Sequence, residues 1–311
     1  MKIRLGYACL PVGLNTTASS IMTYSYYKRL GKINGDLKLN SIILSNLNSL
    51  EEILKYNIKN DIIFFRMTSN LIPLGTHPDV DFEVFEKYKK EFKNLGKIIK
   101  NNNLRVDMHP DQFCVLNSIN ADVVKSTINI LEFNQKMYKY MNLESKLVLH
   151  IGSKVGGKRE SINRFIYNFN NLNDSLKKII VLENDDKVYN IRNVLKVCNK
   201  LDIPMVLDYH HFLCNKNNEK IEDFIQKIFS TWKNETPKIH FSSPKNKKEF
   251  RTHNDYIDAK SFIEFIEKIK FINRDFDIMI EAKAKEEALF RLIRQLKYYG
   301  YDIKGTTIYI K

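Results

Sequence analysis

The segment Val181-Leu182-Glu183-Asn184-Asp185-Asp186 decides the fold, because a short apolar run ends abruptly in carboxylates. Short runs rich in Val, Ile and Leu are typical of buried parallel strands. Five further runs of this kind also end in a residue type that binds metals, and they close at His109, His150, Asp208, His240 and Glu281. Strands that end in His, Asp and Glu and are separated by helices predict a parallel barrel with a multi-metal site at its carboxyl end. This pattern favours metal-assisted hydrolysis.

Eight apolar runs alternate with eight stretches of helical periodicity, and no Pro-, Gly- or Ser-rich linker divides the chain. The alternation predicts an α/β fold, a single (β/α)8 TIM barrel of residues 1–311 with its active site at the carboxyl ends of the strands. We expect strands at 3–8, 61–66, 104–108, 146–151, 178–183, 204–209, 237–242 and 277–281. We expect helices near 40–60, 81–102, 121–142, 159–176, 189–201, 219–232, 257–271 and 284–300. The polar stretch 11–38 is expected to be a long loop, and the strand-like tail at 306–310 has no predicted place.

The chain has enough hydrophobic residues to form a large core, since they make up 43% of its 311 residues. No stretch approaches the roughly 18 uncharged apolar residues of a membrane span. The amino terminus goes directly into a strand pattern without the apolar region of a signal peptide. The four cysteines show no CxxC spacing. These features predict a cytoplasmic, reduced protein without a membrane partner, and we expect a monomer.

The formal net charge is +14. A strongly basic chain favours polyanionic partners such as nucleic acid, because neutralised phosphates release counterions. The sequence is also rich in Lys, Asn and Ile throughout, a bias that genome composition can produce. Charge therefore supports a nucleic-acid partner without deciding it.

The residues that close successive strands of a barrel converge on one space, so they can share metal ions. Glu183, Asp208, His240 and Glu281 close four neighbouring strands and could enclose one ion. His109 and His150 flank Glu183 on the other side and make a second site if that carboxylate bridges, and a third site could draw on His211 and His253. A single His at a strand end is more often structural, but clustered carboxylates repel one another unless cations compensate them. Imidazole together with carboxylate suits Zn²⁺ or Mn²⁺.

Other polar residues near this end of the barrel have open roles. Lys238 lies two residues before His240 and faces the barrel interior, where its pKa should be lowered. It could be a neutral amine, a phosphate ligand or a modified, carboxylated lysine, or it could extend outward to a surface carboxylate. We expect His210 to be structural, and the loop of His77 could bring it to the site or leave it outside. Candidate phosphate contacts, or simply solvated charges, are Lys154, Lys158, Arg159, Lys245, Lys247, Lys248 and Arg251.

Three segments in order, Met108–Ser118, Leu182–Asp186 and Asp208–His211, resemble the UV damage endonucleases, relatives of endonuclease IV with xylose-isomerase-like barrels. Shorter matches extend the resemblance over nearly the whole chain: Ile3–Tyr7, Phe64–Pro73, Val148–Gly152, Lys238–Ser243 and His253–Ile257. The resemblance implies cleavage of damaged double-stranded DNA immediately 5′ to cyclobutane pyrimidine dimers and 6-4 photoproducts, with abasic sites also possible, as the first step of excision repair. It also implies three divalent metal ions, most often Mn²⁺, with Zn²⁺ or Mg²⁺ possible.

The resemblance assigns roles to individual positions of this chain. It implies metal binding by His109, His150, Glu183, Asp208, His211, His240, His253 and Glu281, together with His77. Lys238 matches the family lysine described as carboxylated, and we expect Glu183, Lys238 and His240 to take part in catalysis. Gln112 and Phe113 match the pair that probes DNA opposite the lesion, and Tyr7 stands at a lesion-contacting position.

Two departures from the family pattern bear on substrate choice. The usual His-Pro-Gly-Gln-Tyr reads His109-Pro110-Asp111-Gln112-Phe113, and the usual Ser-Ser-Asp reads Thr68-Ser69-Asn70. Phe113 keeps a stacking face but lacks the hydroxyl, and Asp111 adds a negative charge near the expected DNA path. Lesion preference therefore stays open. An abasic-site endonuclease, a sugar isomerase or epimerase on the same barrel, and a damage-binding protein without turnover are the alternatives.

Overall fold

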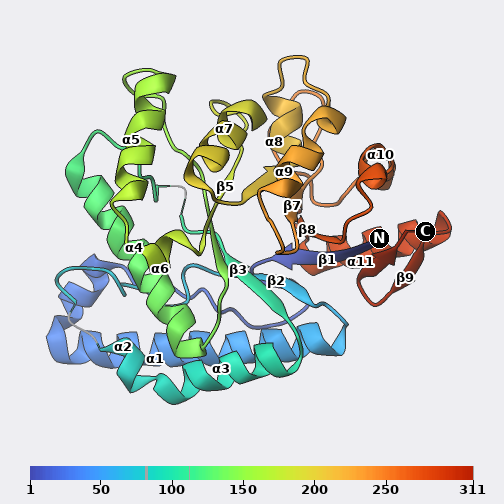
Figure 1. The fold of residues 1–311 in the computed structure, drawn as a ribbon. Coiled ribbons are helices and arrows are strands. Elements are labelled where there is room, and N and C mark those ends of the chain that lie inside the picture. The colour runs from blue at the N-terminus through green and yellow to red at the C-terminus, as the bar shows by residue number, and fades with distance from the viewer. Residues whose placement is uncertain (81–82, 112, 311) are drawn as a thin grey trace.

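A computed structural model describes residues 1–80, 83–111 and 113–310. Eight parallel strands form a closed barrel with helices around it (Figure 1), in which β1 pairs with both β8 and β2. The strands are β1 (Lys2–Ala8), β2 (Phe64–Met67), β3 (Arg105–Met108), β4 (Lys146–Leu149), β5 (Ile180–Glu183), β6 (Met205–Asp208), β7 (Lys238–Phe241) and β8 (Phe276–Ile280). The predicted (β/α)8 TIM barrel is confirmed.

The helices cover the outside of the barrel, and α1 and α3 lie side by side along one flank in Figure 1. Their bounds are α1 (Tyr24–Lys59), α2 (Val84–Lys87), α3 (Lys89–Asn101), α4 (Ala121–Met141), α5 (Lys158–Asn170), α6 (Asp174–Lys177), α7 (Ile191–Leu201), α8 (Tyr209–Cys214), α9 (Ile225–Ser230), α10 (Ala259–Ile269) and α11 (Lys285–Tyr298), with 3₁₀ turns η1 (Ile221–Asp223) and η2 (Lys270–Ile272). The helices predicted at 81–102, 159–176 and 219–232 are each divided into shorter pieces. No helix in these described ranges is long and apolar enough to cross a membrane.

The prediction of a loop over 11–38 is wrong for its second half, because α1 already begins at Tyr24. Thr23 caps this helix, and its side chain accepts a hydrogen bond from the backbone N–H of Tyr26. Gly31 then breaks the helix with φ 72° and ψ 164°, a conformation that other residues rarely adopt. The break interrupts the apolar periodicity, so the first helical turns read as a polar loop.

The carboxyl-terminal tail forms a hairpin that extends the sheet at the start of the barrel. Its strands are β9 (Asp302–Lys304) and β10 (Thr307–Tyr309), and β10 runs antiparallel to β1. The first half of β1 pairs with β10, whereas the second half pairs with β2. The tail therefore belongs to the amino end of the barrel, away from the predicted site.

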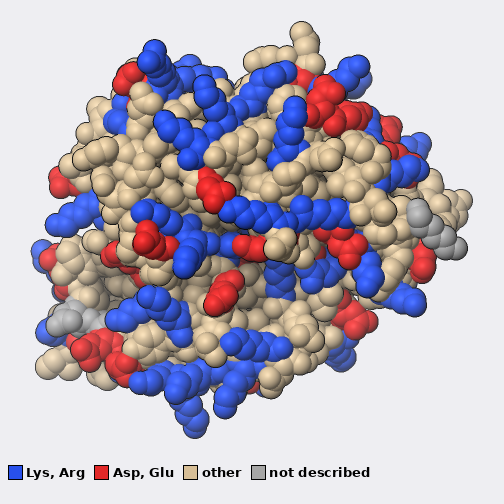
Figure 2. All heavy atoms as spheres, viewed as in Figure 1, with Lys and Arg blue, Asp and Glu red and all other residues tan. Residues whose placement is uncertain are grey.

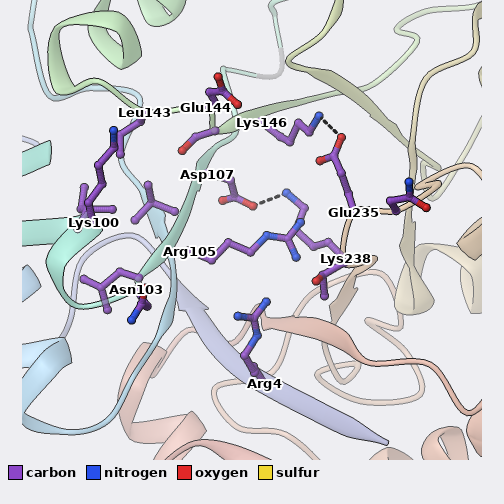
Figure 3. Close-up of a pocket in the computed structure, with 16 residues that line it drawn as sticks. Arg4, Lys100, Asn103, Arg105, Asp107, Leu143, Glu144, Lys146, Glu235 and Lys238 are labelled. Carbon is purple, nitrogen blue, oxygen red and sulfur yellow. Dashed lines mark hydrogen bonds and ion pairs between the residues drawn. The ribbon is translucent and has the colours of Figure 1, made fainter.

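Alternate residues of each strand point into the barrel, and the interior is partly apolar and partly ionic. Val148, Val181, Val206 and Trp232 form an apolar cluster inside the barrel, separate from the core between strands and helices. Nearer the amino ends of the strands the interior opens into a cavity of about 590 Å³ (Figure 3). Several charged residues around this cavity are paired: Arg4 and Arg105 with Asp277, Lys146 with Glu235, and Lys238 with Asp107. Buried and partly buried ion pairs thus line the amino-end half of the barrel.

The molecular surface reflects the basic composition. Lysine and arginine side chains are spread over the face seen in Figure 2, with acidic side chains among them. The candidate phosphate contacts are all exposed: Lys154, Lys245, Lys247, Lys248 and Arg251 in the loops after β4 and β7, and Lys158 and Arg159 in the first turn of α5. Two of these already have partners, since Lys245 pairs with Glu249 and Arg251 lies 3.5 Å from Asp186.

Candidate metal centre

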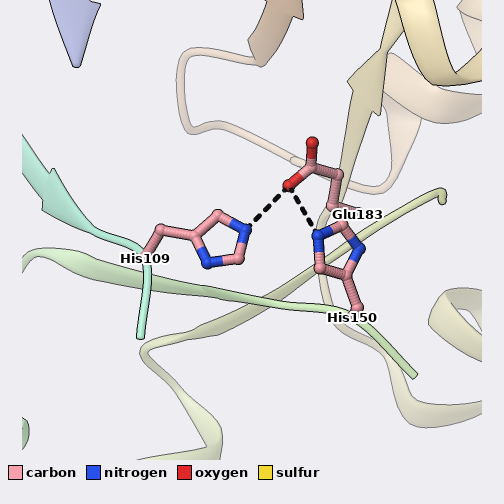
Figure 4. Close-up of side chains that lie close together, drawn as sticks. All are labelled: His109, His150 and Glu183. Carbon is pink, nitrogen blue, oxygen red and sulfur yellow. Dashed lines mark hydrogen bonds and ion pairs between the residues drawn. The ribbon is translucent and has the colours of Figure 1, made fainter. Parts of the chain in front are cut away.

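Three residues that follow or close neighbouring strands form a first potential metal site (Figure 4). His109 follows β3, His150 follows β4 and Glu183 ends β5. Glu183 Oε2 lies 3.2 Å from His109 Nε2 and 3.7 Å from His150 Nε2. One ligand atom from each residue falls within 4.8 Å of the others, a spacing that one ion could span.

A second potential site lies on the other side of the same carboxylate. His240 Nδ1 lies 2.8 Å from Glu183 Oε1 and 3.4 Å from Glu281 Oε1. Asp208 completes the group, and its ligand atom also lies within 4.8 Å of those of the other three residues. Glu183 therefore presents Oε2 to the first site and Oε1 to the second, as a bridging carboxylate would.

Strand pairing explains why these side chains meet. Asp208 on β6 stands beside His240 on β7, and Glu183 is in register with Val206, two residues before Asp208. Since alternate residues of a strand share a face, Glu183, Asp208 and His240 all point inward at the same end of the barrel. All three are at most 2% exposed. The site is thus a buried layer at the carboxyl ends of the strands, where TIM barrels carry their active sites.

Asp208 uses only one of its two carboxylate oxygens in hydrogen bonds with described residues. Its Oδ1 caps α8 by accepting from the backbone N–H of His211 at 2.7 Å. Its Oδ2 is buried and finds no hydrogen-bond partner among residues 1–80, 83–111 and 113–310. A buried carboxylate oxygen without a partner is costly unless a ligand satisfies it. This oxygen therefore fits a metal ligand.

His211 and His253 lie beside this layer but outside both groups. His211 Nδ1 donates to the backbone carbonyl of Asn184 at 3.0 Å, which leaves Nε2 available. The ring of His253 is centred 6.3 Å from that of His211. Asp208 adjoins them, because its Oδ2 lies 3.6 Å from His211 Nδ1.

The protonation states of His150, His240 and Glu183 suit cation binding. Burial lowers the pKa of His150 and of His240, so both imidazoles stay neutral and keep a lone pair for a metal. Burial would raise the pKa of Glu183, but the charges of His240 and His150 when protonated, together with hydrogen bonds from His109 and His240, hold it well below its ordinary value. Neutral imidazole with ionised carboxylate is a donor set for divalent transition metals. The residues present thus fit the predicted ions.

Asp208 and His211 together hold a proton in the structure as it stands. Burial raises the pKa of Asp208 well above its ordinary value. Burial opposes the charge on His211, yet Asp208 and Glu183 raise its pKa to about 9. A cation that binds Asp208 must therefore displace a proton from this pair.

Arg66 and Asp107, which the sequence pattern did not single out, lie directly beneath the cluster. Arg66 on β2 donates to Glu281 Oε1 at 2.6 Å, and its Nε lies 3.7 Å from Asp107 Oδ1. Asp107 on β3 also pairs with Lys238, which faces inward as predicted. Burial lowers the pKa of Lys238 to about 8. The available signal was a charge at the end of the apolar run Ile62-Ile63-Phe64-Phe65-Arg66, within the strand predicted at 61–66.

The structure contradicts the predicted contact between Tyr7 and DNA. Tyr7 is fully buried, and its hydroxyl donates to Asn57 of α1 at 2.8 Å. The cause is strand parity: Ile3, Leu5 and Tyr7 face the helices, while Arg4 faces the interior, where it pairs with Asp277.

His77 and His210 lie apart from the two groups of metal ligands. The ring of His77 stacks on Tyr24 with centroids 3.9 Å apart, and its Nδ1 accepts from the backbone N–H of Asp79. His77 belongs to neither of the two groups of potential ligands. His210 is buried with its Nε2 3.8 Å from Cys214 Sγ, a structural position as predicted. His210 and His211 are consecutive residues of α8, so their side chains point in different directions.

The loop after β3 carries the two residues predicted to probe DNA. Phe113 is 76% exposed, an unusual position for a large apolar side chain. Gln112 lies outside the described residues. The ring of Phe113 therefore lies at the protein surface.

Comparisons with known proteins agree with this architecture. Residues 3–307 match the family model of UV-endonuclease UvdE. A UV DNA damage endonuclease of Bacillus cereus (strain B4264) is 37% identical over 301 residues, which cover 95% of each chain. The crystal structure of SacUVDE superposes with a TM-score of 0.86 at 33% identity, over 96% of this chain and 99% of that one. Endonuclease IV from Thermus thermophilus shares the fold, with a TM-score of 0.57 at 11% identity over 95% of this chain and 98% of that one. The chain belongs to the UV-endonuclease UvdE family.

Proposed function

We propose that this protein is a metal-dependent UV DNA damage endonuclease that hydrolyses the phosphodiester immediately 5′ to cyclobutane pyrimidine dimers and 6-4 photoproducts, and also acts at abasic sites. The observation that carries the proposal is the position of Glu183, whose two oxygens face two different groups of potential ligands. Family membership and the curated relatives, which are UV DNA damage endonucleases, supply the substrate class.

The proposed centre holds divalent ions in two adjoining sites and a third beside them. The ligands would be His109, His150 and Glu183 at the first site, Glu183, Asp208, His240 and Glu281 at the second, and Asp208, His211 and His253 at the third. Mn²⁺ is the proposed metal, because the shell mixes imidazole with carboxylate. When bound, such ions activate water as a nucleophile and stabilise negative charge on the phosphate and the leaving oxygen.

The chain's own residues would do the remaining work. Glu183 would hold the two adjoining sites at a fixed separation, and the buried position of the layer would keep bulk water away from it. The damaged nucleotides must leave the stack first, which costs a few kcal/mol and less for distorted bases. Phe113, exposed in the loop after β3, would stack in the gap together with Gln112. Lysines of the β4 and β7 loops would contact the backbone phosphates of damaged double-stranded DNA.

A plasmid nicking assay tests this proposal. Supercoiled plasmid is left untreated, irradiated with short-wave ultraviolet light or depurinated, and each sample is incubated with metal-stripped protein plus Mn²⁺, Mg²⁺ or Zn²⁺. We expect nicks in the irradiated plasmid only when metal is present, with 3′-hydroxyl and 5′-phosphate ends. Nicking of depurinated plasmid alone would replace the proposal by an abasic-site endonuclease. Binding to irradiated DNA without any nicking would indicate a damage-binding protein.

A further inference from the structure

A buried arginine on a strand that supplies none of the proposed ligands touches two of them. Arg66 lies on β2 and is 6% exposed. Its Nη1 donates to Glu281 Oε1 at 2.6 Å. Its Nη2 lies 2.7 Å from Nε2 and 3.4 Å from Nδ1 of His240. An in-plane approach to one ring nitrogen would leave the other farther away, so the guanidinium lies over the face of the imidazole.

These contacts fix two ligands of the second site in different ways. A guanidinium is always charged and donates from a planar fork, so it holds a carboxylate oxygen in a defined direction. With Oε1 of Glu281 bound to Arg66, Oε2 is the oxygen left for another partner. Over His240, the same cation disfavours protonation of the ring and limits its rotation. Nδ1 of His240 stays directed at Glu183 Oε1, 2.8 Å away.

Arg66 is itself held from below by the ionic interior of the barrel. Its Nε lies 3.7 Å from Asp107 Oδ1, and the other oxygen of Asp107 pairs with buried Lys238. Asp107 is 2% exposed and Lys238 is 1% exposed. The guanidinium therefore lies among Asp107, Glu281 and His240, and its closest contacts are with Glu281 and His240, since its Nε forms no hydrogen bond with any described residue.

We propose that Arg66 is a positioning residue for the second metal site, which sets the orientation of Glu281 and His240 without binding the ion itself. The inference rests on the proposed metal centre. The role applies to the second site only, because the hydrogen bonds and ion pairs that Arg66 makes with described residues reach Glu281 and His240 but not His109 or His150. Loss of the guanidinium should therefore weaken metal binding at the second site and leave metal binding at the first site unchanged.

The test is Mn²⁺ binding to Arg66→Lys by titration calorimetry, with free Mn²⁺ counted by electron paramagnetic resonance. Lysine keeps the charge but cannot span Glu281, His240 and Asp107 together. We expect one Mn²⁺ to bind at least tenfold more weakly (an order-of-magnitude expectation), while the ion at His109 and His150 is retained. Arg105→Lys is the matched control. Arg105 is also a barrel arginine bound to an aspartate, 2.5 Å from Asp277 Oδ2, but it lies at the opposite end. The Arg105→Lys substitution should leave the Mn²⁺ affinities of both sites unchanged.

Each other outcome has a defined meaning. Equal Mn²⁺ binding by Arg66→Lys and the unsubstituted protein would overturn the positioning role, because charge alone would then suffice. Tighter binding would also overturn it, since Arg66 would then be a competitor of the ion. Arg66→Gln, which keeps a hydrogen-bond donor, should show the same selective loss. If neither variant unfolds cooperatively, Arg66 belongs to the stability of the barrel and the inference fails. If the unsubstituted protein binds no Mn²⁺, the proposed metal centre itself is wrong.

Discussion

The two ends of the barrel interior both contain buried charges, but carboxylates are matched by cations at the amino end and outnumber them at the carboxyl end. At the amino end, Asp277 is bound by Arg4 and Arg105, and Asp107 is bound by Lys238. At the carboxyl end, Glu183, Asp208 and Glu281 crowd together, and Arg66 is the arginine placed against them. The free Oδ2 of Asp208 lies at this end too. Paired charges indicate a structural role, whereas surplus carboxylates with open donor atoms indicate a place for cations.

The largest effect is expected at the carboxyl end, from Glu183→Gln. The amide keeps the size of the side chain but removes the charge shared by the two proposed sites. We expect nicking of irradiated plasmid to fall by about a thousandfold or more, with loss of bound Mn²⁺ and a retained near-ultraviolet circular dichroism spectrum. Retained nicking with the normal metal content would show that Glu183 does not bridge, and the contrast between the two ends would lose its functional meaning.

The matched change at the amino end is Asp277→Asn. Asp277 is fully buried and accepts from Arg4 Nε and Arg105 Nη1, both at 2.5 Å. Removing its charge leaves two cations without their partner, so the free energy of unfolding should fall by about 3 kcal/mol. Urea denaturation measures this loss, and Mn²⁺ titration should show unchanged affinity. A variant of normal stability that lost Mn²⁺ would reverse the roles assigned to the two ends.

Much of this contrast could be predicted from the sequence, because parallel strands end at one edge and alternate residues share a face. The positions of Glu183, Asp208, His240 and Glu281 follow from those two rules, as does the inward direction of Lys238. The rules do not say which face of an individual strand points inward. Tyr7 is an example: the family resemblance placed it at a lesion-contacting position, but the parity of its strand turns it toward α1.

Arg66 shows a second limit of prediction from sequence, which concerns the contacts of a side chain rather than the direction in which it points. Its role depends on Glu281, 215 positions away, and on His240, which only the closed barrel brings within reach. The start of α1 was missed for a local reason, since Gly31 interrupts the helix and the apolar pattern with it. Long-range pairing and backbone breaks are both weakly encoded in short sequence windows.

Because Asp208 and His211 hold a proton, the affinity for metal ions at the carboxyl end of the barrel should depend on pH. Without metal, the pKa of His211 is raised to about 9, so the imidazole holds a proton below that pH. Metal binding must displace this proton, so affinity should rise with pH by up to about tenfold per unit from neutrality to about pH 9, and fall in acid. Calorimetry near neutral pH in buffers of different ionisation enthalpy should show release of at least one proton. Metal binding without proton release would contradict the assignment of Asp208 and His211 as ligands.

The smallest effect is expected outside the barrel, from Lys247→Ala in the loop after β7. Lys247 is exposed and forms no ion pair with any residue that the structure describes, whereas neighbouring Lys245 is bound to Glu249. If Lys247 contacts a DNA phosphate, binding to irradiated and undamaged duplexes should weaken by a similar, severalfold factor. The slope of log affinity against log salt should become shallower by about one. Lys245→Ala is the matched control and should change the slope less, because its charge is already compensated. A change confined to irradiated DNA would instead place Lys247 at the lesion, and the rim of the barrel would then take part in recognition.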